Sequence, residues 1–346
     1  MNIRCAASAW LLAFALCGAA AAFDTIQTGK GKISGRIVEM DAAKIDVEQG
    51  AGGAMLQHVP VNEIQAVFYD AEPADLKTAK KRVLERRYPE AQAALERIKQ
   101  EPNRPEIRQD IEFYKSLCDA KLALAGIRNV ADAGRRMKAF ADANPKNYHY
   151  FQAIETVGDL LLAVRQYAQA AEFYARLDGA PWPDYKMRAG VAAGRVLLEQ
   201  GKARDALAAF DNVLANDAEG NLAEEQRIAA RLGKAAALTA LKRSDEALKI
   251  VDAILLKADP DDAPLMARAY DIQGTALRQA GRTKEAIVAF LHVDLLYASE
   301  PQAHAEALAN LAELWEQEHK VERANRARQA LEEKYKDSPW AKKAKR

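Results

Sequence analysis

The sequence feature that most constrains the fold is a pattern of small and large residues that returns five times between residues 150 and 335. In each copy a Gly or Ala is followed by a large residue three positions later, by Ala twelve later, and by large residues sixteen and nineteen later. The copies start at Gly158, Gly194, Ala235, Gly274 and Ala312. One position, Arg328, breaks the pattern. Such a recurrence indicates stacked copies of one supersecondary unit.

Each copy has the layout of two helices joined by a short turn. The small residue and the large residue after it belong to the first helix, and the alanine with the two later large residues forms the apolar stripe of the second. We expect the small residue to let the second helix approach closely, with the alanine of that helix facing it across the contact. Short polar or glycine-containing segments separate the two helices, at 165–167, 200–202, 242–244, 280–282 and 318–320.

This layout resembles the tetratricopeptide repeat over residues 150–335. Two weaker copies precede it, around Ala91 and Ala133, so that the alanine recurs seven times at spacings of 36 to 42 residues. Repeats of this kind stack on their neighbours, and each one buries its apolar face against the next. The sequence therefore predicts a mainly α chain in which residues 75–340 form a right-handed α-solenoid of about seven helix pairs, preceded by a small all-β domain.

Residues 23–71 have a different texture. Short β-branched runs, such as the one from Ile33 to Met40, are separated by turn signals at 29–31, 41–43 and 50–53, which predicts four or five strands. The stretch T-x-x-G-x-I-x-G-x-I from Thr28 to Ile37, together with a short closing strand from Ile64 to Phe68, resembles the Sm-like small barrel. Members of that family often bind RNA, but we do not expect RNA binding here, because the chain is near neutral and its first 22 residues predict export.

Residues 1–22 carry the pattern of a secretory signal peptide. Arg4 precedes an apolar stretch, and Ala20 and Ala22 form a small-x-small cleavage site. Cleavage after Ala22 leaves Cys118 as the single cysteine, which excludes an internal disulfide. We therefore expect an exported protein without stable membrane insertion after cleavage. The opposite end of the chain, residues 341–346, is a basic tail.

The segment 335–341, with the sequence YKDSPWA, resembles the end of repeat proteins of the bacterial envelope. Examples are the periplasmic coordinator of the Tol–Pal system and the outer-membrane assembly lipoproteins. Lys336 stands where their pattern has proline, and the coiled coil of the Tol–Pal protein is absent from the sequence. The resemblance implies a location in the periplasm or cell envelope of a diderm bacterium.

The sequence offers no pattern of catalytic or metal-binding residues. Its 50 basic and 49 acidic residues balance, so no overall charge attracts nucleic acid. The five histidines form no H-x-x-x-H pair and none adjoins a cysteine. The acidic segment 259–262 resembles the start of a calcium loop, but Pro264 stands where glycine is needed, which indicates a turn. We therefore predict a protein that is not an enzyme and that binds no cofactor or metal.

The remaining prediction is a scaffold that binds a protein or peptide along the first helices of its repeats. Eight polar residues of these helices avoid the repeat pattern: Gln152, Glu155, Asp159, Arg188, Arg195, Arg268, Asp271 and Arg278. Their arginines favour a partner with an acidic segment, and we expect charge reversal at Arg195 and Arg278 to leave the fold intact.

An alternative is an accessory protein of envelope or cell-wall polysaccharide metabolism, in which the β domain contacts polymer or an enzyme. Exposed aromatic side chains on that domain would favour it, and Phe68 and Tyr69 are the candidates.

Overall fold

The N-terminal part of the computed structural model, which describes residues 23–50 and 55–344, is a five-stranded antiparallel sheet. The strands are β1 (Asp24–Thr28), β2 (Gly31–Met40), β3 (Lys44–Gln49), β4 (Met55–Pro60) and β5 (Ile64–Phe68), in the order β4-β3-β2-β1-β5. A short 3₁₀ turn, η1 (Val61–Glu63), leads into β5. The predicted strands are present. The turn expected at 50–53 lies largely outside the described residues, and so does the predicted signal peptide.

A bend in β2 lets the sheet curl. The register between β2 and β3 shifts between Ile37 and Glu39, and such an irregularity increases the local twist. Gly35 permits the close approach of β3, since a Cβ atom at this position would lie 2.3 Å from the carbonyl oxygen of Glu48. The glycine that the sequence analysis placed in a strand therefore has a packing reason.

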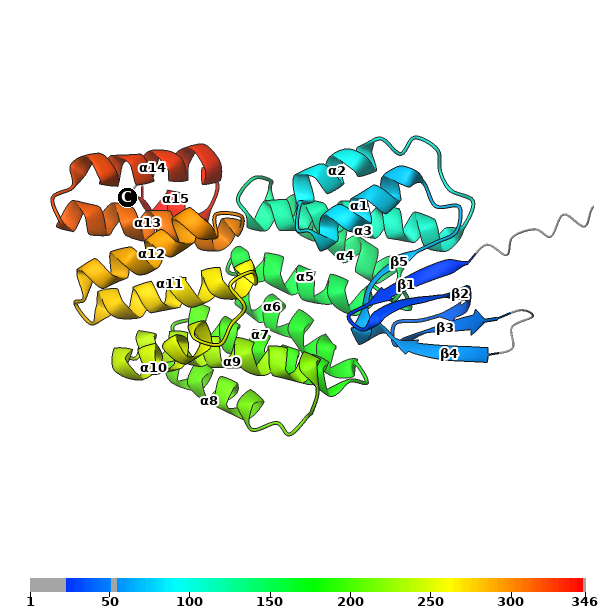
Figure 1. Cartoon of the computed structure of the whole chain (residues 1–346), viewed down its shortest axis with the longest axis horizontal. Coiled ribbons are helices and arrows are strands. Elements are labelled where there is room, and N and C mark those ends of the chain that lie inside the picture. The colour runs from blue at the N-terminus through cyan, green and yellow to red at the C-terminus, as the bar shows by residue number, and fades with distance from the viewer. Residues whose placement is uncertain (1–22, 51–54, 345–346) are drawn as a thin grey trace, which may run out of the picture.

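The rest of the described chain is helical, which confirms a mainly α protein with a small β part (Figure 1). The helices are α1 (Ala74–Leu84), α2 (Tyr88–Glu96), α3 (Pro105–Leu124), α4 (Val130–Ala143), α5 (Tyr150–Ala163), α6 (Tyr167–Ala175), α7 (Pro183–Glu199), α8 (Ala203–Leu214), α9 (Asn221–Ala240), α10 (Ser244–Leu255), α11 (Ala263–Gln279), α12 (Thr283–Leu296), α13 (Pro301–Gln317), α14 (Val321–Tyr335) and α15 (Pro339–Ala344). A second 3₁₀ turn, η2 (Arg176–Gly179), follows α6. Helices α1 to α14 pack in consecutive pairs, and the short α15 packs on α13 and α14.

The turns inside the pairs repeat one backbone conformation. Each has one residue with a positive φ of 58° to 76°, in the region that favours glycine. The residue is glycine in three pairs and a larger residue in four: Arg86, Gly126, Arg165, Gly201, Lys242, Gly281 and His319. All five turns predicted from the main repeat pattern contain one of these residues. The position ends the first helix in a left-handed cap and reverses the chain.

The glycines of the repeat pattern make room for aromatic rings rather than for the alanines. A Cβ atom on Gly158 would lie 2.5 Å from the ring of Tyr174, one on Gly194 would lie 2.6 Å from the ring of Phe210, and one on Gly274 would lie 2.7 Å from that of Phe290. The pattern alanines are buried, as expected. At these three glycines the expectation that the alanine faces the small residue was wrong, because the ring four residues after the alanine fills that space.

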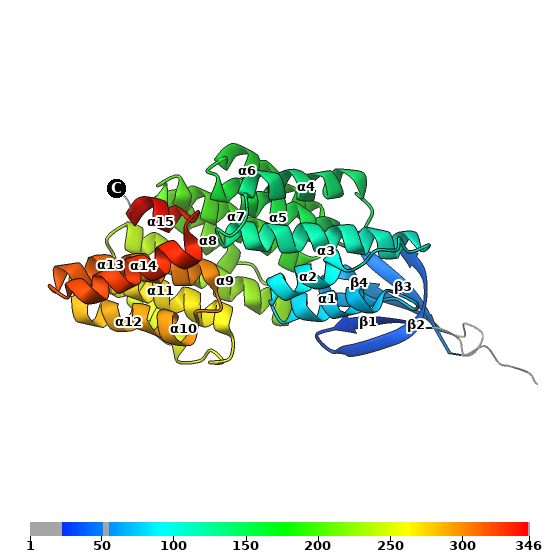
Figure 2. The same cartoon turned by 90° about the horizontal axis from the view of Figure 1, so that it is seen from above.

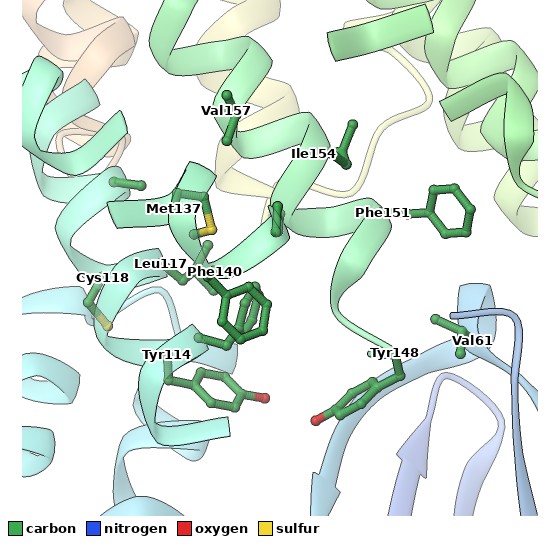
Figure 3. Packing of buried hydrophobic residues seen from close by; sticks show 14 of the residues in the cluster. Val61, Tyr114, Leu117, Cys118, Met137, Phe140, Tyr148, Phe151, Ile154 and Val157 are labelled. Carbon is green, nitrogen blue, oxygen red and sulfur yellow. The ribbon is translucent and has the colours of Figure 1, made fainter. Parts of the chain in front are cut away.

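The sheet is not packed independently of the helices. One cluster of buried apolar residues runs from Ile26 and Val67 of the sheet through α1 to α7. Figure 3 shows Tyr114 and Leu117 of α3 beside Phe140 of α4, with Tyr148 lying on the side of the strands. A small domain of this size is marginal alone, and here the first repeats complete its core.

The two ends of the helical region meet (Figures 1 and 2). Arg86, in the turn between α1 and α2, donates to both carboxylate oxygens of Glu300, just before α13, at 3.0 and 3.2 Å. Gln302 donates to the carbonyl oxygen of Leu124 at 3.3 Å. A Cβ atom on Gly126 would lie 2.9 Å from the backbone nitrogen of Ser338. The first repeats therefore contact the last, and the solenoid closes on itself.

No helix in the described part of the chain combines the length and the apolar character that crossing a bilayer requires.

Candidate functional site

The odd-numbered helices from α3 to α13 form the inner layer of the solenoid. Contacts run from α3 to α5 and from α7 through α9 and α11 to α13. We call the inner face the surface of α5, α7 and α11 that carries the predicted polar residues, together with the surface of α13 that contacts it. Asp159 of α5 and Arg195 of α7 both act on the pKa of Arg268, although α11 lies three repeats after α5. The side chains of these non-adjacent repeats therefore share one surface, on the inside of a solenoid whose first and last repeats are in contact.

Two acid–base pairs join α5 to α7 on the inner face. Arg188 donates to Glu155 at 3.2 Å, and Arg195 donates to Asp159 at 3.0 Å. The Tyr174 hydroxyl also donates to Asp159 at 2.7 Å. Burial raises the pKa of Asp159, but Arg195 is the first of several partners that lower it by more, so its pKa lies below the ordinary value. These four predicted residues are thus brought together, and their charges are already paired.

A third cluster joins α11 to α13. Arg278 donates to the side-chain oxygen of Asn310 at 2.7 Å and to Glu313 at 2.5 Å. Lys343 of α15 approaches the other oxygen of Glu313, at 3.8 Å. Arg278 was predicted from the sequence, whereas Asn310 and Glu313 were not. The signal that could have found them is the offset between successive first helices, which places residues 32 to 35 positions apart side by side.

Arg268 and Asp271 differ from the other predicted residues because they have no hydrogen-bonding partner for their side-chain polar groups. Within residues 23–50 and 55–344, no hydrogen bond or ion pair is formed by the guanidinium of Arg268, and Oδ1 of Asp271 is buried without a partner. Burial and the nearby Arg195 lower the pKa of Arg268 to about 10. Burial and then Glu306 raise the pKa of Asp271 well above its usual value.

The inner face corrects one expectation about charge reversal. Arg195 and Arg278 are half-buried and bonded to carboxylates, so a glutamate at either position would face an acid. Charge reversal there is therefore expected to destabilise the fold, because it removes an ion pair and leaves like charges together.

Gln152, the remaining predicted residue, is exposed near the start of α5 and is the most accessible of the set.

A second cluster of titratable residues lies where the sheet meets the helices. The ammonium of Lys80 donates to the carbonyl oxygen of Val67 and to Glu72, both at 2.6 Å, and lies 2.7 Å from Asp110. Asp110 also accepts from the Tyr148 hydroxyl and contacts His149. Lys80 and Asp110 are fully buried. These buried bonds therefore hold the sheet against the first repeats. The cluster was not predicted from the sequence.

The other candidates for chemistry have ordinary environments. Cys118 is buried, and burial raises the pKa of its thiol to about 12, which makes it unreactive. The residues that the structure describes contain no group of three or more His, Cys, Asp and Glu arranged to hold a metal ion. Asp262, in the segment that resembles a calcium loop, caps α11 by accepting from the backbone nitrogen of Leu265.

Comparison with known proteins identifies the fold alone. No family model matches the sequence, and no curated protein matches it significantly. A solved tetratricopeptide repeat protein from Parabacteroides merdae is similar with a TM-score of 0.51 and 17% identity, over 78% of this chain and 95% of that one. The Rap protein complexed with Competence and Sporulation Factor is similar with a TM-score of 0.54 and 16% identity, over 78% and 79%. The helical region is therefore a tetratricopeptide-like solenoid.

Proposed function

We propose that this protein is a non-enzymatic, exported scaffold of the cell envelope that binds a protein or peptide on its inner face. The observation that carries the proposal is the surface shared by the first helices, where charged side chains from α5, α7, α11 and α13 converge. The Rap protein, which has a similar fold, was solved in a complex with Competence and Sporulation Factor. That complex supports a binding role for a solenoid of this kind.

In this proposal the partner need not carry an acidic segment, although the arginines of the sequence favour one. Arg188, Arg195 and Arg278 already hold carboxylates of the chain itself. An acidic segment would have to displace these bonds, and of the four predicted arginines only Arg268 has no hydrogen-bonding or ion-pair partner among the described residues. The inner face is therefore better described as a surface of mixed charge than as an anion-binding groove.

The alternative role for the β domain has less support. Tyr69 is buried and Phe68 is half-buried, so neither provides the open aromatic platform that polymer binding would use. The strand order and the 3₁₀ turn before β5 support the proposed Sm-like barrel. In this proposal the domain closes the first end of the solenoid.

Photo-crosslinking in the native envelope tests the proposal. A benzophenone amino acid replaces Gln152, on the exposed part of the inner face, and in a matched variant it replaces Gln169, exposed on the second helix α6. We expect one discrete crosslinked product at position 152 and none at position 169. Equal products at both positions, or a product at 169 alone, would contradict binding on the inner face.

A further inference from the structure

The contacts between α11 and α13 follow a fixed offset, and this offset places one acid opposite another. Arg278 bonds Glu313, which is 35 residues later. Seven residues, about two helical turns, before each of them stand Asp271 and Glu306, so the same offset pairs these two. On α5 and α7 the corresponding places hold acid–base pairs, Glu155 with Arg188 and Asp159 with Arg195. At Asp271 and Glu306 the offset instead pairs two acids.

Within residues 23–50 and 55–344, no hydrogen-bond donor reaches the side-chain oxygens of this pair. Asp271 is 5% exposed, and its Oδ1 atom has no partner among the described residues. A buried acceptor without a donor is costly, and native structures almost always satisfy it. Asp271 stands two helical turns before the half-buried Arg278, on the same side of α11, so a ligand that lies along the inner face can bring the donor.

The charges around the pair favour a cationic donor. Four groups face Glu306: Asp271 and Arg268 from α11, Glu199 from α7 and Lys343 from α15. Burial and then Glu199 raise the pKa of Glu306 to about 7, while Arg268 and Lys343 act in the opposite direction. The amine of Lys343 already lies 3.8 Å from Glu313, two turns along the same helix. Around the pair the acids Asp271, Glu199 and Glu306 outnumber the bases Arg268 and Lys343, so a further cation is favoured electrostatically.

We propose that Asp271 and Glu306 form a subsite for a cationic nitrogen group, a lysine ammonium or a free amino terminus, of a peptide bound on the inner face. The proposal rests on the proposed function and specifies the chemistry of the partner. The cation would donate to the orphaned oxygen of Asp271 and neutralise the facing carboxylate of Glu306. The described residues contain no group of three or more His, Cys, Asp and Glu arranged to hold a metal ion, so we propose an organic cation as the occupant.

Calorimetric titration with short peptides tests the subsite. The probes are acetylated tetralysine amide, which offers side-chain amines, and tetraalanine amide with a free amino terminus. Acetylated tetraglutamate serves as the control of opposite charge. We expect at least one cationic probe to bind at pH 8 and tetraglutamate to bind much more weakly. Comparison of the two cationic probes shows which source of the amine the subsite prefers.

The variants Glu306→Gln and Asp271→Asn should each weaken the binding of the cationic probe at least about tenfold, because charged hydrogen bonds are lost. The matched control Glu322→Gln removes an exposed acid of α14 and should leave binding unchanged. Between pH 6 and pH 8 the wild-type affinity should rise about five- to tenfold, because Glu306 loses its proton in this range. Melting curves verify that each variant is folded.

Several outcomes would overturn the subsite: no binding of either cationic probe, equal affinity in Glu306→Gln and Glu322→Gln, or a preference for tetraglutamate. These outcomes are distinguishable from a failure of the proposed function. Crosslinking at position 152 together with unchanged lysine binding in Glu306→Gln would leave the binding face standing and would overturn the subsite alone.

Discussion

At the scale of single residues, the aromatic rings of the second helices carry much of the repeat packing. The ring of Phe290 is fully buried against Gly274, and the pattern alanine Ala286 beside it has no exposed surface. Protein interiors pack at crystal-like density, so both a lost ring and an added branch disturb them. The rings of Tyr174 and Phe210 occupy equivalent places in two other repeats.

Removing volume at Phe290 and adding volume at Ala286 should both destabilise the protein. Phe290→Ala should lower the free energy of unfolding by about 3–5 kcal/mol because it opens a cavity. Ala286→Leu should lower it by about 1–3 kcal/mol because it overpacks the helix pair. Urea denaturation measures both, with the exposed Lys284→Leu as the control. A neutral Ala286→Leu beside a severe Lys284→Leu would show that the repeat register is wrong.

The left-handed turn residues allow a second prediction at this scale. Gly281 has a φ of 75°, and no atom lies within 4 Å of the place where its Cβ would stand, so Gly281→Ala tests backbone strain alone. It should cost about 1 kcal/mol. Lys242 has a φ of 64° in the equivalent turn, and Lys242→Ala should change stability by less than about 0.5 kcal/mol because a side chain is already present. Equal losses in the two variants would refute the strain argument.

At the scale of helices, the facing acids of α11 and α13 are a local weakness of the free protein. Burial first, and then neighbouring acids, raise the pKa values of Asp271 and Glu306 above those of the unfolded chain. The folded state therefore binds more protons than the unfolded state between about pH 4.5 and 7. The stability from this source is present at low pH and is lost as the pH rises through about 7.

Glu306→Gln should remove this dependence. At pH 8 the variant should be more stable than the wild type by about 1–3 kcal/mol, and at pH 5.5 the difference should shrink. Urea denaturation across the pH range gives the comparison, and Glu322→Gln serves as the exposed control. Parallel profiles of wild type and Glu306→Gln from pH 5 to 8.5 would mean that Glu306 titrates normally.

The helices and turns were predictable from the sequence because their signals are local and recur. Each turn was placed within a few residues by its polar or glycine segment, and the pattern identified the buried alanines. The bonds of the inner face were not predictable in the same way. The pairing of Asp159 with Arg195, or of Arg278 with Glu313, depends on the offset between successive first helices, and that offset varies with the lengths of the connections.

The buried lysine was missed for a different reason. A lysine at position 80 reads as a solvated residue of a helix, since isolated lysines are almost never fully buried. Its partners Glu72 and Asp110 come from a loop and from another helix, and the backbone acceptor at Val67 comes from the sheet. Only the packing of the sheet against the first repeats brings these four groups together.

At the scale of the whole molecule, closure of the solenoid depends on a few contacts between its ends. Gly126 has a φ of 76° and touches the backbone of Ser338. Gly126→Ala should therefore cost at least about 1 kcal/mol more than Gly281→Ala, because it combines backbone strain with a steric clash. Amide exchange in residues 336–344 should also become faster. An unchanged exchange rate and a loss equal to that of Gly281→Ala would show that the contact does not hold the ends together.

The proposed export predicts the start of the mature chain. Cleavage after Ala22 would begin the protein at Phe23, immediately before β1. Intact mass spectrometry of the protein from the envelope fraction should give the mass of residues 23–346. A mass that includes residues 1–22 would refute processing at this position. The measured mass also shows whether any lipid is attached.

The central claim is that the inner face, formed by the first helices, is the binding surface. Amide hydrogen exchange of the mature protein, alone and saturated with the partner identified by crosslinking, measures this directly. We predict slower exchange in peptides from α5, α7, α11 and α13 and unchanged exchange in α6, α8, α12 and α14. Protection confined to the second helices, or to strands β2 to β4, would contradict the claim.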